Sequence, residues 1–415
     1  MIKKLFILIL LFTFQLFPQS DDAVKKEIES ILKKLPSTTK VALLIVKPLT
    51  QDTIFQLNHT RSMIPASNTK LFTTAASLSI LGGDFVLSTK ILSDDNDLSD
   101  STINGNIYIK GYGNSLFTSS DMDSLVNVIK DMGIKKITGN VIGDDSFFDE
   151  IYSRKDWIDD EHANVRLPAI SGLVVDRNRR FTYRKRRGRV RRYYHNISNP
   201  PLFAAEILKR KLKKAQISVS GKALKGITPD DVKSLAESDI TLRHLVKEIN
   251  KHSDNFLAEC LFKTLGAVTS GKQGNSFYST QAVLGFIEDN GIYSDGTSVV
   301  DGSGISRFDQ ITVGAIVGIL EKMYFSLKSY KDYYNSLSIA GIDGTLEKRM
   351  RKTKAENSFH GKTGTLNGVS SLSGYLKTPN GEEVIVSMIF EFSRGGTNFH
   401  RRIEDKIIEA LTDLD

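Results

Sequence analysis

A serine and a lysine at helical spacing are the first residues in this sequence that could carry out chemistry. In Ser67-Asn68-Thr69-Lys70, the hydroxyl and the amine lie three residues apart, so a helix places both on one face. A serine hydroxyl is a weak nucleophile until a neighbouring base takes its proton. A lysine can be that base when burial or nearby positive charge keeps its amine partly neutral. By itself, however, Ser-x-x-Lys equally describes an exposed helix face.

Two further motifs make the chance interpretation less convincing. Ser253-Asp254-Asn255 falls between two predicted helices, and Lys362-Thr363-Gly364 opens a predicted strand. Taken separately, they describe a helix cap and an ordinary edge strand. In the order Ser-x-x-Lys, Ser-x-Asn, Lys-Thr-Gly, they are the signature set of penicillin-recognising serine enzymes.

The sequence around the first motif, residues 65–76, resembles a known family. It is similar to the nucleophile segment of the D-alanyl-D-alanine carboxypeptidase/endopeptidases of peptidase family S13, the class C low-molecular-mass penicillin-binding proteins. The likeness extends from about residue 40 to 410 and is poor at about 150–200. Further similar segments are residues 143–149, 301–307 and 341–346.

The resemblance implies a role for each residue of the first two motifs. Ser67 attacks the carbonyl of the penultimate D-alanine, and Lys70 is the general base. Ser253 relays a proton to the departing D-alanine nitrogen. Asn255 holds the substrate backbone.

The resemblance also implies that the third motif binds substrate. Lys362 and Thr363 bind the terminal carboxylate, and Gly364 and Thr365 continue the substrate-binding strand. The backbone N–H groups of Ser67 and Thr365 form the oxyanion hole.

The elements that position these motifs come from both ends of the chain. Buried strands are predicted at 41–46 and 53–56, and a helix from Pro65 to Leu81. Near the other end, a strand meander over 360–392 precedes an amphipathic helix at 399–411. Helices are predicted between these two groups of strands.

We therefore predict an α+β fold of the serine β-lactamase/penicillin-binding-protein type. An antiparallel sheet with a helical layer would carry a large inserted α/β region. The expected catalytic domain is discontinuous, residues 21–88 and 240–415, and the insertion spans 89–239.

Composition agrees with a folded protein of this size. The 415 residues include 56 Lys and Arg and 48 Asp and Glu, a net charge of +8, and 40% are hydrophobic. The single cysteine, Cys260, excludes an internal disulfide framework. The seven histidines show no ligand spacing, so we predict neither a metal nor a cofactor.

The first twenty residues have the composition of a signal peptide. Lys3 and Lys4 precede an apolar run over 5–17, shorter than the ~20 residues that span a bilayer. We expect residues 1–20 to direct export to the periplasm or cell envelope. No small-x-small site precedes Asp21, so an uncleaved anchor is the alternative.

One stretch is unusually basic. Ten of the 16 residues from Arg177 to Arg192 are Lys or Arg, with aromatic residues interleaved and Gly188 at a possible turn. Such a composition can bind nucleic acid, which an exported chain seldom meets. A solvated hairpin that contacts an anionic envelope polymer is the better interpretation.

The sequence thus predicts a serine-type D-Ala-D-Ala carboxypeptidase and/or D,D-endopeptidase. It would act on peptidoglycan stem peptides through an acyl-enzyme on Ser67, and β-lactam antibiotics would inhibit it. A β-lactamase or related esterase on the same fold is one alternative, although no Glu-x-x-Leu-Asn pattern follows Asn255. A non-catalytic envelope-binding or sensor protein is another, and the intact motifs oppose it. The oligomeric state is left open.

Overall fold

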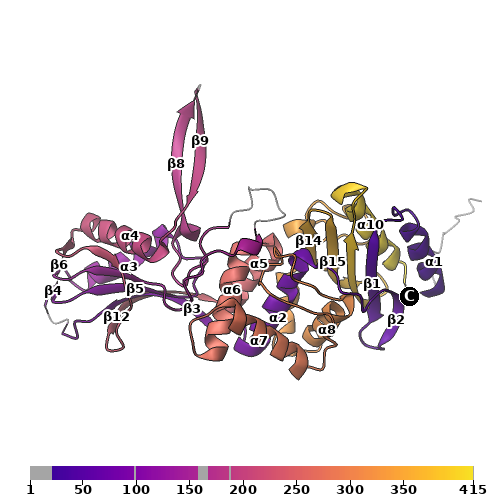
Figure 1. Ribbon diagram of the computed structural model, residues 1–415, viewed down its shortest axis with the longest axis horizontal. Helices are drawn as coiled ribbons and strands as arrows, with labels where there is room; N and C mark the ends of the chain where they lie inside the picture. Colours follow the sequence, from indigo (N-terminus) through magenta and orange to yellow (C-terminus); the bar gives the residue numbers. More distant parts are fainter. Residues whose placement is uncertain (1–20, 98–99, 158–166, 187, 415) are drawn as a thin grey trace, which may run out of the picture.

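The computed structural model describes residues 21–97, 100–157, 167–186 and 188–414. The predicted signal peptide and Arg187 of the basic stretch lie outside the described residues. The molecule is elongated, with the strands from the two chain ends gathered at one end and the strands of the inserted region at the other (Figure 1).

The main sheet is built from both ends of the chain, as predicted. Its strand order is β13-β14-β15-β16-β1-β2, and all neighbouring strands are antiparallel. The N-terminal strand β1 pairs with β16, so that Lys40 lies opposite Glu391 and Val46 opposite Ile385. The strands are β1 (Lys40–Lys47), β2 (Asp52–Leu57), β13 (Ser338–Ile339), β14 (Phe359–Leu366), β15 (Val369–Lys377) and β16 (Glu383–Glu391).

Helices cover both faces of this sheet, which explains why β1 is an unbroken apolar run. Ala42 and Leu44 face the helical layer that contains α2, whereas Leu43 and Ile45 face the helices of the two chain ends. The helices are α1 (Asp21–Leu32), α2 (Thr69–Leu81), α5 (Leu242–His252), α6 (Asn255–Ser270), α7 (Ser276–Asp289), α8 (Val313–Tyr324), α9 (Tyr330–Ser336) and α10 (Gly396–Leu411).

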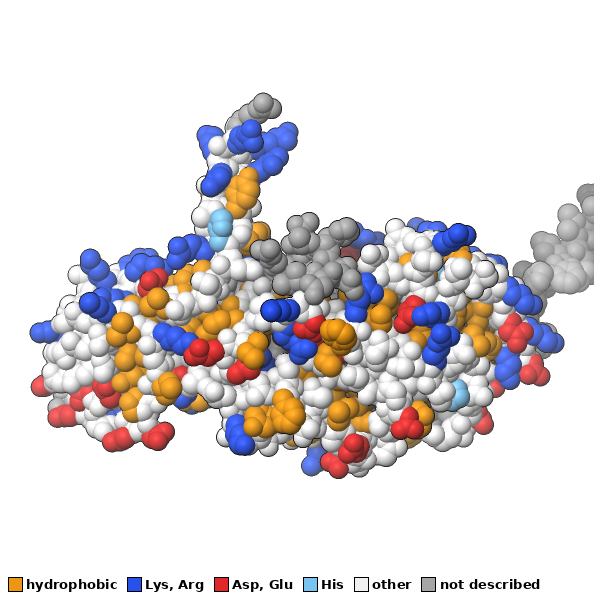
Figure 2. All heavy atoms as spheres, in the orientation of Figure 1, with side chains coloured by type: hydrophobic (Ala, Val, Ile, Leu, Met, Phe, Trp, Pro, Cys, Tyr) orange, Lys and Arg blue, Asp and Glu red, His pale blue; other side chains and the backbone are white. Residues whose placement is uncertain are grey.

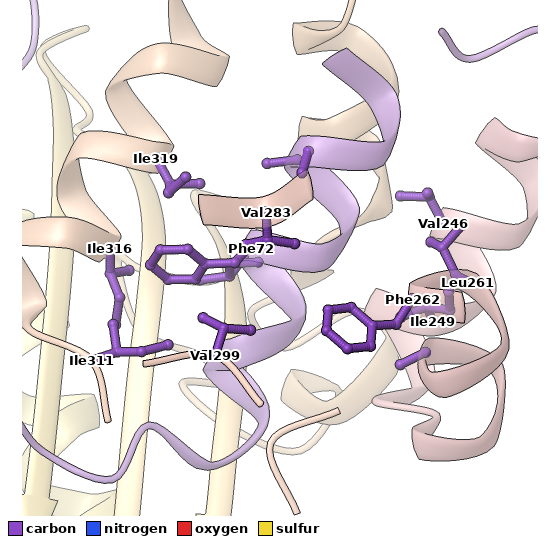
Figure 3. Packing of buried hydrophobic residues seen from close by; sticks show 14 of the residues in the cluster. Phe72, Val246, Ile249, Leu261, Phe262, Val283, Val299, Ile311, Ile316 and Ile319 are labelled. Atoms are coloured by element: carbon purple, nitrogen blue, oxygen red, sulfur yellow. The ribbon is translucent and has the colours of Figure 1, made fainter. Parts of the chain in front are cut away.

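Helix α2 lies at the centre of the helical layer. Every residue from Thr69 to Leu78 is buried, as expected for a helix surrounded by protein on all sides. Figure 3 shows the Phe72 side chain of α2 among Val283 of α7 and Ile316 of α8. This packing places the beginning of α2, which carries the first motif, against neighbours that allow it little freedom.

The inserted region forms a mixed α/β unit with its own core. Its larger sheet has the order β11-β7-β5-β3-β12, and a small parallel sheet has the order β10-β6-β4. The predicted boundaries, 88/89 and 239/240, fall within β3 and β12, and this division of the chain stays a prediction. The elements are β3 (Val86–Ser93), β4 (Thr102–Ile103), β5 (Ile107–Tyr112), α3 (Ser119–Asp131), β6 (Lys136–Ile137), β7 (Val141–Asp144), α4 (Pro200–Lys214), β10 (Ser218–Val219), β11 (Ala223–Lys225) and β12 (Lys233–Thr241).

The basic stretch forms the predicted hairpin. Strands β8 (Arg179–Arg186) and β9 (Arg189–Asn196) pair only with each other and project from the body of the molecule (Figure 1). Gly188 has a φ of +76°, the left-handed conformation that a tight turn requires. The hairpin is fixed at its base and solvated along its length.

Candidate active site

The first motif begins on a tight turn. A single 3₁₀ turn, Ala66–Asn68, precedes α2, so the prediction of one continuous helix from Pro65 is wrong in its first turn. Ala66 has a φ of +49°, a left-handed conformation that is strained for a residue with a side chain. The turn leaves Ser67 half-buried ahead of the buried helix.

Lys70 is completely buried and has three polar partners. Its Nζ donates to Ser67 Oγ at 3.0 Å, to Asn255 Oδ1 at 2.6 Å and to the Ser303 carbonyl at 2.5 Å. Burial lowers the pKa of Lys70 from 10.5 to about 8, although nearby carboxylates, chiefly Asp301, oppose the change. A useful fraction of neutral amine is therefore available beside the serine hydroxyl near neutral pH.

The second motif joins α5 to α6. Ser253 ends α5 in a left-handed conformation, with a φ of +52°. Asp254 is the N-cap of α6, and its carboxylate accepts a hydrogen bond from the Leu257 N–H at 3.0 Å. This cap fixes the first residue of α6, Asn255, with its side-chain oxygen on Lys70.

The third motif brings a second buried lysine to the site. Lys362 Nζ donates to Ser253 Oγ at 2.7 Å and to the Thr363 carbonyl at 2.9 Å. Burial lowers the pKa of Lys362 well below its usual value, and the positive charge of Lys70 adds to this effect. The contacts thus bring together Ser67, Lys70 and Asn255 in one group, and Ser253 and Lys362 in another.

The rest of the predicted substrate strand runs beside Ser67. Thr363 Oγ1 donates to Thr345 Oγ1 at 2.9 Å, and Arg401 Nη2 donates to Thr365 Oγ1 at 2.9 Å. Between them, Gly364 lets the strand backbone approach Ser67, because a Cβ there would lie 3.0 Å from the Ser67 nitrogen. The β14 backbone at Gly364 therefore lies directly beside the Ser67 backbone.

A cationic cavity of about 510 Å³ opens on the Thr363 side of this strand. Arg349 is neutralised by Glu404 at 2.9 Å and Asp405 at 2.7 Å. Within the described residues, the other basic side chains of the cavity form no ion pair. Its lining consists of Thr345, Lys348, Arg349, Thr363, Asn398, Arg401 and Arg402.

Several residues that contact the site are assigned no role in it from the sequence. Arg401 and Thr345 stand outside the three motifs. The loop at 301–304 belongs to a segment that is similar to the family, but none of its residues was given a role. In the structure, the Ser303 carbonyl contacts Lys70. Asp301 holds this loop by accepting hydrogen bonds from the N–H groups of Ser303 at 3.0 Å and of Gly304 at 2.6 Å. The Asp-Gly-Ser-Gly composition of a tight turn was the available signal.

A serine hydroxyl beside a buried amine, on an antiparallel sheet covered by helices, defines an active-site-serine enzyme of the penicillin-binding type. The chain belongs to the D-Ala-D-Ala carboxypeptidase 3 (S13) family, whose family model matches residues 24–190 and 185–414. This confirms the predicted family and fold class.

Known relatives are similar over most of their length. The D-alanyl-D-alanine carboxypeptidase DacB of Haemophilus influenzae is 27% identical over 433 residues, which cover 89% of each chain. The D-alanyl-D-alanine carboxypeptidase of an Actinomadura species is 24% identical, over 86% of this chain and 79% of the relative. The crystal structure of penicillin binding protein 4 (dacB) from Haemophilus influenzae matches with a TM-score of 0.79 and 22% identity, over 92% of this chain and 98% of the other.

Proposed function

We propose that this protein is a serine-type D-Ala-D-Ala carboxypeptidase that also cleaves D,D-crosslinks between peptidoglycan stem peptides. The observation that carries the proposal is the buried Lys70 amine, 3.0 Å from the Ser67 hydroxyl and with a pKa lowered to about 8. Family membership and the names of the relatives support the substrate class.

In the acylation step, Ser67 Oγ attacks the carbonyl carbon of the penultimate D-alanine while Lys70 accepts the hydroxyl proton. The negative charge on the carbonyl oxygen is stabilised by the backbone N–H groups of Ser67 and Thr365. Gly364 supports this assignment, because the absence of its side chain allows the two backbones to approach each other.

The C–N bond then breaks, and the departing nitrogen takes a proton through Ser253. The hydrogen bond from Lys362 to the Ser253 hydroxyl, at 2.7 Å, supports this relay by orienting the hydroxyl. Water hydrolyses the resulting ester and regenerates Ser67. A D-alanine leaving group corresponds to carboxypeptidase activity, and a second stem peptide to endopeptidase activity.

The substrate is held on both sides of the cleaved bond. Asn255 binds the backbone of the acyl part, and the charge of Lys362 with the Thr363 hydroxyl binds the terminal carboxylate. The cationic cavity on the Thr363 side supports this orientation, since it favours an anionic leaving group.

We also propose that the protein is exported and that the basic stretch from Arg177 to Arg192 contacts an anionic component of the cell envelope. The amino-acid pattern of residues 1–20 supports export. Among the described residues, no helix has both the length and the apolar character needed to cross a membrane.

Labelled penicillin tests the acyl-enzyme. The label should remain on a peptide containing Ser67 after denaturation, and Ser67→Ala should abolish it. Ser62→Ala, which removes a nearby exposed hydroxyl, should label normally. Equal labelling of Ser67→Ala and the wild type would refute the assignment. Mass measurement of products from crosslinked and uncrosslinked muropeptides would then separate loss of D-alanine from opening of the crosslink.

A further inference from the structure

The hairpin β8–β9 is a cationic structure that the proposed acyl transfer does not use. Ten of the 16 residues from Arg177 to Arg192 are basic, and no Asp or Glu occurs between Asp176 and Glu206. Figure 2 shows Lys and Arg side chains gathered on the part of the hairpin that stands clear of the body. Arg177, which precedes β8, pairs with Asp254 of the second motif, but the proposed acyl transfer leaves the charge of the hairpin strands unexplained.

The strand register sorts the hairpin side chains onto two faces, because opposed residues share a face and successive residues alternate. The arginine face carries Arg180, Arg184, Arg186, Arg189 and Arg191, together with Thr182, Tyr193 and His195. The aromatic face carries Phe181, Tyr183, Val190 and Tyr194, together with Arg179, Lys185, Arg192 and Asn196. The Phe181 and Tyr194 rings meet edge to face at 4.9 Å, and the Arg192 guanidinium covers Phe181 at 3.6 Å.

The arginine face places like charges directly opposite each other. Arg184 faces Arg191, and Arg186 faces Arg189. Such cross-strand pairs destabilise a sheet, and a two-stranded ribbon is only marginally stable to begin with. Within the described residues, none of the four forms an ion pair. An anionic partner would remove the repulsion and stabilise the hairpin.

The aromatic face indicates which kind of anion fits. Tyr183, Val190 and Tyr194 are 67%, 63% and 56% exposed, respectively. A soluble polyanion would satisfy the arginines and leave these apolar groups in water. A bilayer offers both partners, because its phosphates match the arginine guanidinium and its interface favours tyrosine rings.

We propose that the β8–β9 hairpin binds the surface of an anionic phospholipid bilayer. Its arginines pair with lipid phosphates, and its tyrosines enter the head-group layer. The proposal rests on the proposed export. It does not rest on the acyl-transfer function, which labelling by penicillin measures separately.

The base of the hairpin gives this contact a fixed direction. Asp176, Arg177 and Asn178 all have left-handed backbones, with φ of 50°, 57° and 50°. Asp176 accepts a hydrogen bond from the Ser119 N–H at 3.0 Å, and Asn178 donates to the Ala169 carbonyl at 2.9 Å. A hairpin held in this way would orient the whole enzyme at the membrane.

Sedimentation of the full mature chain with lipid vesicles tests the proposal. The protein should bind vesicles that contain phosphatidylglycerol, release as salt is added, and ignore vesicles of phosphatidylcholine alone. A quadruple Arg→Ser variant at 184, 186, 189 and 191 should bind roughly a thousandfold more weakly at low salt. Tyr183→Ser with Tyr194→Ser should also weaken binding, although no charge is lost.

Matched controls make the result decisive. Lys26, Lys33, Lys34 and Lys328 are exposed and lie away from the hairpin, and changing them to Ser removes the same charge. This control should bind as the wild type does, and every variant should still be labelled by penicillin. If the lysine control lost as much vesicle binding as the quadruple arginine variant, the assignment of binding to the hairpin would be overturned. The contrary outcome is a tyrosine variant that binds vesicles as well as the wild type does, while the wild type binds inorganic polyphosphate as tightly as it binds vesicles. This pair of results would assign the hairpin to a soluble polyanion and overturn the bilayer proposal.

Discussion

Arg177, at the base of the hairpin, donates a hydrogen bond to Asp254, the middle residue of the second motif, over 2.7 Å. The same guanidinium lies 4.9 Å from the centre of the Phe256 ring. Asp254 caps α6, and the next residue, Asn255, contacts Lys70. The inserted region therefore supports the residues that hold the proposed general base.

Replacing Arg177 with Met should slow acylation by penicillin without unfolding the protein. The pair is partly exposed, so its loss corresponds to about 1 kcal/mol, or roughly fivefold in the acylation rate. Arg179→Met removes a neighbouring charge that also interacts with Asp254 at longer range but whose hydrogen bond goes to Asn196, so it should acylate nearly as fast as the wild type. Stopped-flow measurement of both variants checks this. Identical rates would show that Arg177 does not position the second motif.

The acylation rate should rise with pH and reach half of its maximum near pH 8. The pKa of Lys70 is lowered to about 8, so the amine is protonated and unable to accept the serine proton below this value. Single-turnover rates at saturating β-lactam are the measurement, because substrate binding then no longer contributes to the pH profile. A rate independent of pH from roughly 6 to 9 would exclude Lys70 as the titrating base.

Lys362→Met should lose about 2–3 kcal/mol of transition-state stabilisation on D-Ala-D-Ala peptides, because a charge-assisted hydrogen bond to the terminal carboxylate disappears. A substrate whose carboxylate is amidated should lose less, since that contact is already missing. Steady-state kinetics on both substrates with both proteins form a double-mutant cycle. Simple additivity of the two changes would mean that Lys362 does not recognise the carboxylate.

Gly364→Ala should impair both stability and acylation. The new methyl group would overlap Ser371 Oγ and would lie 2.8 Å from the Pro65 carbonyl oxygen and 3.0 Å from the Ser67 nitrogen, so both the Ser371 side chain and β14 must shift. We expect a loss of about 1–3 kcal/mol in the free energy of unfolding. Gly285→Ala is the matched control, because its methyl group meets nothing within 4 Å on helix α7. It should stabilise the protein by about 0.5–1 kcal/mol in thermal or urea unfolding.

The sequence predicts those parts of the fold in which hydrophobic burial decides the structure. The run at 41–46 predicts β1 because both faces of that strand are covered. Helix α9 and strand β13 are too short, at seven and two residues, to show a period. Helix α1 was not predicted, although the spacing of Val24, Ile28 and Ile31 is helical.

The candidate site likewise contains residues that the sequence identifies and residues that only the fold identifies. The motif residues could be listed from the sequence because each contributes a characteristic side chain. The third partner of Lys70 is the backbone carbonyl of Ser303, which has no residue signature. Arg177 and Arg401 reach the motifs as single residues from distant elements. Only the fold identifies such contacts, because no local pattern marks them.

The pairing of β1 with β16 has a consequence for the order of synthesis. Ser67 and Lys70 are synthesised before Lys362 and β16, which follow about 300 residues later in the chain. Until then, β1 lacks a neighbour along one edge, and the buried setting that lowers the pKa of Lys70 is incomplete. The site around Ser67 and Lys70 can therefore be assembled only after the C-terminal strands have paired with β1, wherever in the cell that folding takes place.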